Sequence, residues 1–319
     1  MRTRSPKIIS LLAVVASAGL LLTGCGGQSS EDSEDGTSGT VTVDGSSTVA
    51  PLSEAAADLF RSEQSDVNVT VATSGTGGGF AKFCAGETDL QDASRPIEDD
   101  EIAACEAAGI DYTEIIIAND GLSVVVNPEN DWAECLTTEQ LATMWGPDAE
   151  GTITNWNQID PSFPDQELSL FGAGTDSGTF DYFTDAINGE EGAIRTDYSP
   201  SEDDNITVQG VSGDTGAVGF FGLSYVEQNS DSVKAVAVDN GSGCVSPTAE
   251  TVQDGTYAPL GRGLYVYVAN ASYTDKPQVK SFVDYYVENA SQVAEDALFI
   301  GLTDEQLTTA QDELASLAS

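Results

Sequence analysis

The chain has 319 residues and is strongly acidic: 53 Asp and Glu stand against 11 Lys and Arg, which gives a formal net charge of −42 at pH 7. Such a charge repels nucleic acid and anionic membranes, so proteins that bind either of them through positive charge are excluded. The sequence contains no histidine, which excludes a Ser-His-Asp hydrolase and argues against a zinc site.

The N-terminus has the order of an export signal. Basic residues precede an apolar run over residues 8–22 that is short for a membrane span, so we expect residues 1–24 to be a signal peptide. The Leu-Thr-Gly-Cys that ends at Cys25 resembles the bacterial lipoprotein signal, in which the cysteine becomes the acylated N-terminus. The alternative is an ordinary secretory signal that ends near a cysteine. Residues 25–39 are almost all small, polar or acidic, which is typical of an unfolded tether. We therefore expect an exported protein, anchored to the outer face of a membrane only through lipidated Cys25.

The remaining cysteines are even in number, as expected of disulfides in an exported chain. They are Cys84, Cys105, Cys135 and Cys244. Of the three possible pairings we prefer Cys84 with Cys105 and Cys135 with Cys244, because the first bond closes a short local loop. None of the four has a CxxC spacing, so we expect no metal site.

From residue 40 the hydrophobic pattern alternates between the periods of strands and helices. Val41 and Val43, and later Val67 to Val71, alternate with polar residues, while residues 52–60 between them repeat with helical spacing. A strand followed by a helix and a second strand is typical of the beginning of an α/β fold. The same reasoning predicts later helices near 98–107, from 137, around 279–286 and from 303, and strands over 115–117, 122–126, 168–171, 233–238 and 264–268. No composition shift marks a linear domain boundary after the tether, as expected of lobes that share the chain discontinuously.

Three short segments rich in Gly, Ser and Thr lie where expected strands turn into expected helices. They are Gly45–Val49, Ser74–Phe80 and Gly174–Phe180. Helix N-termini present free backbone N–H groups, glycine lets an anion approach them, and hydroxyls add donors. One such segment alone is more readily a capped helix, but three in one chain favour a shared anion site. The second segment is not a P-loop, because it lacks the Gly-Lys-Ser/Thr of that motif. It is not a dinucleotide fingerprint either, because it lacks the third glycine of that motif.

Together these motifs make the chain after the tether resemble the phosphate-binding proteins of ABC transporters, the PstS family, and most closely its SphX branch. The motifs are GSSTVAPL at 45–52, SGTGGGF at 74–80, ASRPI at 93–97, DSGTFDYF at 176–183 and RTDY at 195–198. The resemblance implies a two-lobed α/β fold of the class II-like periplasmic-binding-protein type, with two hinge strands that close over a dehydrated phosphate. We place lobe 1 at 40–120 plus 255–319 and lobe 2 at 121–254.

Carried over by motif, the resemblance implies a set of phosphate-binding residues on both lobes. They are Ser47, Thr48, Val49, Thr76, Gly77, Arg95, Ser177, Gly178 and Thr179, with Val49 and Gly178 acting through the backbone. Many family members have an aspartate in place of Arg95, which accepts the phosphate proton and helps to reject sulfate. They also have an arginine in place of Ala173. We predict that Arg195 supplies this missing guanidinium, the alternative being a surface ion pair with Asp197. Arg262, just before a predicted strand, is expected to be structural.

The function implied by the resemblance is capture of inorganic phosphate and its delivery to the permease and ATPase of an ABC transporter. We expect a monomer without enzymatic activity, cofactor or metal, and without nucleic acid as a partner. Three alternatives stay open: a binding protein for another tetrahedral oxyanion such as sulfate or arsenate, an exported scaffold lipoprotein, and a phosphatase-like enzyme that shares the anion site.

Overall fold

The computed structural model describes residues 37–175 and 177–317. The predicted signal peptide, Cys25 and most of the predicted tether lie outside the described residues. Gly39, expected to be the last residue of the tether, is instead the first residue of strand β1 (Gly39–Gly45). Within the described ranges, no helix combines the length and the apolar character that crossing a membrane requires.

The first lobe is built on a sheet with the strand order β2-β1-β3-β12-β4. Its strands are β1 (Gly39–Gly45), β2 (Val67–Ala72), β3 (Leu90–Ala93), β4 (Tyr112–Val126) and β12 (Gly261–Ala269). Strands β1, β2 and β3 are parallel, whereas β12 runs antiparallel to both of its neighbours, β3 and β4. Because β12 comes from the last quarter of the chain, the lobe combines segments that are far apart in the sequence.

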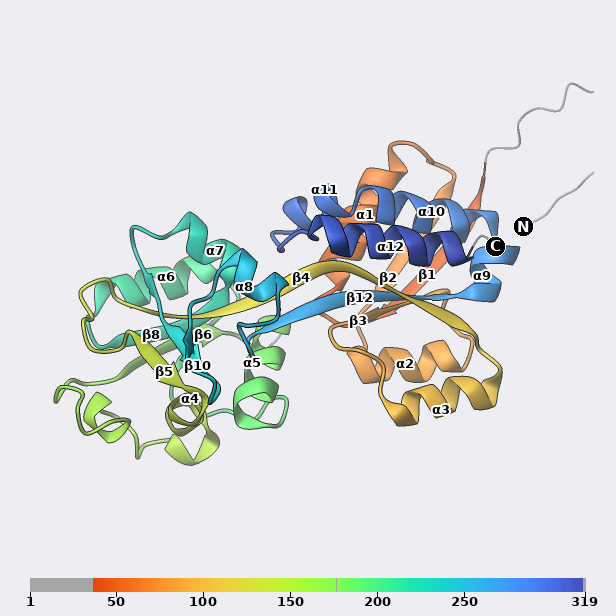
Figure 1. The fold of residues 1–319 in the computed structure, drawn as a ribbon. Coiled ribbons are helices and arrows are strands. Elements are labelled where there is room, and N and C mark those ends of the chain that lie inside the picture. Colours follow the sequence, from red (N-terminus) through yellow and green to blue (C-terminus); the bar gives the residue numbers. More distant parts are fainter. Residues whose placement is uncertain (1–36, 176, 318–319) are drawn as a thin grey trace, which may run out of the picture. The chain divides into compact units, whose positions relative to one another are not determined.

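Helices cover both faces of this sheet (Figure 1). One face carries α1 (Ala50–Arg61), α10 (Pro277–Glu288), α11 (Ala290–Asp296) and α12 (Asp304–Leu317), and the other carries α2 (Thr76–Cys84) and α3 (Asp99–Ala108). The short helix α9 (Asn270–Asp275) follows β12. Leu52, Phe60 and Phe282 are buried on the first face, and Phe80 and Tyr267 on the second. Burial on both faces explains the apolar runs of β4, whereas β2, at the edge of the sheet, alternates between more and less exposed positions.

The second lobe continues from the C-terminal part of β4 in the order β4-β8-β6-β7. Its strands are β6 (Ser169–Ala173), β7 (Ser199–Ser201), β8 (Ala217–Gly222) and β9 (Lys234–Ala235), with a small separate sheet of β5 (Cys135–Thr137), β10 (Ala237–Asp239) and β11 (Cys244–Val245). Its helices are α4 (Thr138–Trp145), α5 (Gly178–Asn188), α6 (Asp204–Gly213), α7 (Leu223–Gln228) and α8 (Ala249–Gln253), and 3₁₀ turns lie at Pro147–Ala149 and Trp156–Gln158. Aromatic rings fill its core, where Phe183 and Phe220 stack with centroids 4.0 Å apart.

Strand β4 belongs to both lobes. It pairs with β12 as far as Gly121 and with β8 from Leu122 onward. The sequence predicted two strands here, over 115–117 and 122–126, because polar residues interrupt the apolar pattern; the structure instead has one strand of 15 residues. One of those polar residues, Asn119, is buried and bonds to the Gly301 carbonyl and to Gln306. The structure confirms the predicted two-lobed α/β fold, and the shared strand explains why no linear boundary is visible in the sequence.

Two disulfides cross-link neighbouring elements, with the pairing that was preferred from the sequence. The bond Cys84–Cys105, with an S–S distance of 1.96 Å, joins α2 to α3. The bond Cys135–Cys244, at 2.04 Å, joins β5 to β11. Bonds of this kind stabilise a fold by about 2–4 kcal/mol each, largely by restricting the unfolded chain.

Candidate functional site

A cavity of about 170 Å³ brings the three glycine-rich segments together, and we call it the interlobe cavity. Its lining from the first lobe includes Ser46, Ser47, Thr48, Gly75, Thr76, Gly77, Ser94 and Arg95. Its lining from the second lobe and from β12 includes Gly178, Asp181, Tyr182, Asp185, Glu191 and Arg262. The cavity therefore lies where the N-termini of three helices, α1, α2 and α5, converge.

The first segment turns from β1 into α1. Gly45 has a φ of 143°, and a Cβ at this position would lie 2.1 Å from the Asp92 carbonyl oxygen, so only glycine fits. The N–H of Thr48 donates to Ser46 Oγ at 3.2 Å, and the Thr48 side chain lines the cavity. The N–H of Val49 instead donates to the Ser46 carbonyl at 3.2 Å, and Val49 is completely buried. The structure thus places Thr48 at the cavity but, contrary to prediction, not Val49.

The second segment turns into α2. Gly75 has a φ of 77°, and α2 begins at the next residue, Thr76. The turn is held by Asp44, whose Oδ1 accepts hydrogen bonds from the N–H and the hydroxyl of Ser74 at 3.0 and 2.7 Å. Thr76 and Gly77 both line the interlobe cavity, at the end of the helix where backbone N–H groups are unpaired.

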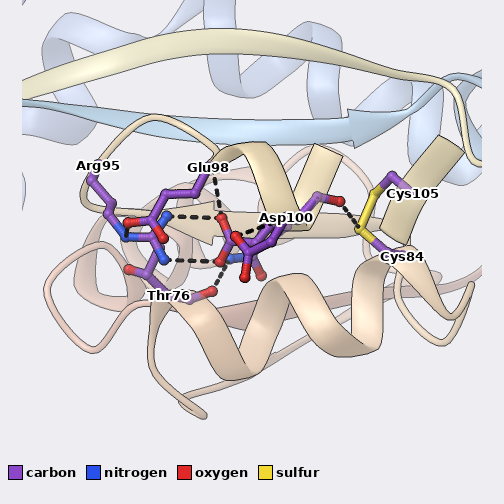
Figure 2. The surroundings of a disulfide bond; sticks show 8 residues. Thr76, Cys84, Arg95, Glu98, Asp100 and Cys105 are labelled. Atoms are coloured by element: carbon purple, nitrogen blue, oxygen red, sulfur yellow. Dashed lines mark hydrogen bonds and ion pairs between the residues drawn. A yellow bond between two sulfur atoms is a disulfide. The ribbon is translucent and has the colours of Figure 1, made fainter. Parts of the chain in front are cut away.

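Arg95 lines the same cavity, but carboxylates already neutralise its charge. Its Nη1 and Nη2 each donate to one carboxylate oxygen of Glu101 at 2.8 Å, and its Nε lies 3.2 Å from Glu98. The bonds to Glu101 raise the pKa of Arg95 above its usual value. Figure 2 shows the guanidinium beside Thr76, with dashed lines to the carboxylate, and the α2–α3 disulfide at the other end of the helix pair. Arg95 therefore brings donors to the cavity rather than a free positive charge.

The third segment, at the start of α5, contacts the first. A Cβ at Gly178 would lie 2.4 Å from Thr48 Oγ1, so only glycine allows this approach between the lobes. Ser177 does not line the cavity, because its hydroxyl caps α5 by accepting from the Thr179 N–H at 3.2 Å. Thr179 lines a neighbouring cavity of about 260 Å³ beside Asp120 instead. Of the three residues predicted in this segment, the structure brings Gly178 to the interlobe cavity and not the other two.

Arg262 is the guanidinium at the cavity that the sequence reasoning missed. Its Nη2 donates to Thr48 Oγ1 at 3.0 Å, its Nη1 lies 3.4 Å from the Ser94 carbonyl oxygen, and its Nε lies 3.2 Å from Asp120. The guanidinium also stacks on Tyr182, with Cζ 3.5 Å from the ring centroid. The sequence showed an arginine just before a strand, but not that this strand runs alongside β4 at the crossing between the lobes.

Arg195, predicted to supply the guanidinium of the anion site, does not line the interlobe cavity, and it forms the ion pair with Asp197 that was the alternative. Its side chain is 3% exposed and forms an ion pair with Asp197, with 2.5 Å between Nε and Oδ1. Its Nη1 donates to the carbonyl oxygens of Met144 and Ile153 at 3.0 and 2.9 Å. The hydrogen bond from Arg195 lowers the pKa of Asp197 to about 2. Its donors are engaged in tying α4 to the loop before β7, so its role is structural.

Three carboxylates face the interlobe cavity from the second lobe. Asp181 and Asp185 lie one turn apart on α5, and Glu191 follows in the next turn. Burial raises the pKa of Asp181, although Ser47 and Arg262 act in the opposite direction. Burial also raises the pKa of Glu191, with the charges of Asp181 and Asp185 adding to the effect. The sequence could not single them out among 53 acidic residues.

The described part of the chain contains no group of three or more His, Cys, Asp or Glu side chains arranged to hold a metal ion. The residues that line the interlobe cavity offer hydrogen bonds and charge. Hydroxyls, helix N-termini and two guanidinium groups supply donors, and this combination suits a small anion with several oxygens.

Comparison with known proteins places these features among phosphate-binding proteins. The family model described as "PBP superfamily domain" matches residues 30–290. Protein SphX of Synechocystis is 48% identical over 84% of this chain and 80% of its own length. The phosphate-binding protein PstS of Staphylococcus saprophyticus is 39% identical over 93% of this chain and 91% of its own length.

Solved structures agree in fold. The crystal structure of a possible phosphate binding protein from Planctomyces limnophilus matches with a TM-score of 0.85 and 44% identity, over 89% of this chain and 100% of that chain. An ABC-type phosphate transport receptor from Vibrio cholerae matches with a TM-score of 0.65 and 24% identity, over 82% of this chain and 99% of that chain. The second likeness carries information on the fold alone.

Proposed function

Because the chain belongs to the PBP superfamily and, within it, to the family of the SphX and PstS proteins, we propose that it captures inorganic phosphate in the interlobe cavity. The observation that carries the proposal is the convergence of three helix N-termini and Arg262 on one small cavity. A tetrahedral oxyanion can accept several hydrogen bonds at once, which is what such a set of donors provides. The protein binds its ligand and does not transform it.

Five residues are proposed to hold the phosphate directly. Thr48 donates its hydroxyl hydrogen to the anion, because its oxygen already accepts from Arg262 at 3.0 Å. Thr76 and Gly77 offer donors at the start of α2, and Gly178 offers its backbone N–H at the start of α5. Arg262 directs a guanidinium N–H at the anion, in place of the role first assigned to Arg195. Ser47 and Arg95 stand at the edge of this set.

Phosphate capture is proposed to close the two lobes about the crossing strands. Lobe 1 (40–120 plus 255–319) and lobe 2 (121–254) are connected through β4 and through the chain that leads into β12. Arg262 is suited to couple ligand to closure, because it contacts Thr48 of the first lobe and Tyr182 of the second. Hinge closure of this kind occurs where a ligand contacts both halves of a binding protein.

In the cell, the protein is proposed to capture phosphate outside the cytoplasm and to deliver it there to an ABC transporter, which consists of a permease and an ATPase. We expect the protein to act as a monomer that is exported through the signal at residues 1–24 and held at the membrane by lipidated Cys25. This part of the proposal rests on the sequence motif and on the relatives, since these residues lie outside those that the structure describes.

Calorimetric titration tests the proposal. Phosphate should bind with a stoichiometry of one, and an assay with phosphate esters should show no turnover. Sulfate and arsenate are the competing ligands, because Arg95 occupies the position at which many relatives have a proton-accepting aspartate. If phosphate produces no binding heat and no thermal shift while sulfate does, the site belongs to a different oxyanion.

A further inference from the structure

The interlobe cavity is more acidic than a simple anion site requires. The ionisable groups that line it are two guanidinium groups and three carboxylates, in addition to one tyrosine. Both guanidinium groups already have carboxylate partners, since Arg95 pairs with Glu101 and Arg262 with Asp120. An entering phosphate therefore meets neutral donors and compensated cations on one side and three carboxylates on the other.

Asp181 is the carboxylate that an anion would approach most closely. It lies on the first turn of α5, which begins at Gly178, and its Oδ2 is 3.4 Å from the hydroxyl of Ser47 in the α1 turn. It is half-buried, whereas Asp185 and Glu191 are exposed at the rim of the cavity. The charge of an exposed carboxylate is screened by solvent and salt, whereas the charge of a half-buried one is screened much less.

The charged and titratable groups around Asp181 come from every element that borders the cavity. Arg262 approaches from β12, with Asp120 of β4 behind it, and Arg95 lies beyond the start of α2. The same helix and the turn after it supply Tyr182, Asp185 and Glu191. Arg262 is thus the cation that acts on Asp181, and it shares its charge with Asp120.

We propose that anion capture in the interlobe cavity is coupled to the uptake of one proton by Asp181, whose carboxylic acid then donates a hydrogen bond to the anion. The proposal rests on the proposed function. The proton comes from solvent and adds to Oδ1 or Oδ2 as the anion enters; no other bond forms or breaks, and the proton returns to solvent on release. Burial raises the pKa of Asp181, and the negative charge of a bound anion acts in the same direction.

Protonation also changes what the cavity can recognise. An ionised carboxylate only accepts hydrogen bonds, so it suits an oxyanion that carries a proton, whereas a carboxylic acid can donate to a fully ionised oxygen. With Asp181 protonated, the residues proposed around the anion are all donors: Ser47, Thr48, Thr76, Arg262 and Asp181. The carboxylic acid of Asp181 can then donate to an ionised oxygen of phosphate, and sulfate, which carries no proton at neutral pH, should bind more tightly as the pH falls.

The proton count on phosphate binding tests this coupling. Titrations of phosphate at about pH 7 in buffers of different ionisation enthalpy report the number of protons taken up, and comparison with Asp181→Asn isolates the contribution of Asp181, because Asn keeps the shape and the donor but cannot titrate. The parent should take up about one proton more than Asp181→Asn, and because phosphate itself titrates near neutral pH, the carboxylic-acid band in the infrared spectrum described below assigns that proton to a carboxyl group rather than to the anion. Asp231→Asn, which removes an exposed carboxylate of the same lobe away from the cavity, should match the parent. Equal proton counts in the parent and Asp181→Asn would overturn the proposal.

A measurement on the parent protein alone covers the case in which Asp181→Asn fails to fold or to bind. Addition of phosphate should produce the C=O stretching band of a protonated carboxylic acid in the infrared difference spectrum. A spectrum without that band contradicts proton uptake by any carboxylate. Failure of the proposed function is distinguishable from this outcome, since the parent would then show no phosphate binding in any buffer.

Discussion

Replacement of Arg262 by Ala should weaken phosphate binding more than any other single loss of positive charge in the described part of the chain. The side chain is 16% exposed and donates to Thr48 Oγ1 at 3.0 Å, so its removal takes a donor and a charge out of the interlobe cavity. It also leaves Asp120, which is 13% exposed, without its cation. Both changes act against binding.

The size of the effect follows from these contacts. Truncation of one partner in a buried, hydrogen-bonded charge pair costs about 2–5 kcal/mol of binding free energy. Since about 1.4 kcal/mol corresponds to a factor of ten, the dissociation constant should rise by roughly 30-fold to several thousand-fold. Arg262→Lys keeps the charge but loses the planar fork and the stacking on Tyr182, so it should restore only part of the affinity.

Calorimetric titration of both variants, with their melting temperatures measured in parallel, gives the comparison. Arg61→Ala is a matched control, because it removes an arginine that forms only a surface ion pair. The Arg61 side chain is 64% exposed and that of its partner Asp58 is 74% exposed. An exposed pair contributes little, so this control should bind phosphate within about a factor of two of the parent. If folded Arg262→Ala binds equally well, then Arg262 does not contact the anion and the proposed ligand set is wrong.

Three further predictions concern stability, pH and anchoring. Arg195→Ala should lower the free energy of unfolding by about 1–3 kcal/mol in urea denaturation, because the carbonyl oxygens of Met144 and Ile153 lose a buried donor, while phosphate affinity in the folded fraction stays near that of the parent. Burial raises the pKa of Asp92 from 3.8 to about 8, so the folded protein keeps a proton that the unfolded chain loses. Stability should therefore fall as the pH rises from about 4 to about 8, by at most about 1.4 kcal/mol per unit, and an equal slope in Asp92→Asn would contradict this. Cys25→Ser should move the protein from membrane to soluble fractions or leave its signal uncleaved; unchanged fractionation and maturation would mean that Cys25 is not lipidated.

The glycine-rich turns of the site could be predicted from the sequence, because the start of a helix has a local sequence signature. Gly45, Gly75 and Gly178 stand at turns where a side chain would clash or where φ is positive, and glycine is selected by that local geometry. Thr137, at which a helix was expected to begin, forms a capping box with Gln140 three residues later, with bonds of 3.1 and 2.9 Å. Motifs of this kind depend on residues a few positions apart, so they can be recognised without knowledge of the fold.

The partners of the arginines could not be recognised in that way. Arg195 and Arg262 both precede polar or strand-forming residues, and nothing local to either one reveals which faces the cavity. Arg262 reaches Thr48 across 214 positions of sequence, and it does so only because β12 pairs with β3 and β4 between the lobes. Arg195 is instead drawn to carbonyl oxygens at the end of α4, contacts that also arise from packing.

The sequence by itself determined the fold class, the preferred disulfide pairing, the family and the three glycine-rich helix starts, because each depends on periodicity, spacing or short motifs. Only the tertiary structure decided that residues 112–126 form one strand shared by both lobes, that Arg262 rather than Arg195 lies at the cavity, and that Asp181 faces it from α5. Those features are set by strand register and by contacts between distant segments. In a chain with 53 acidic residues, the position of one carboxylate against a cavity can be known only once the lobes are packed.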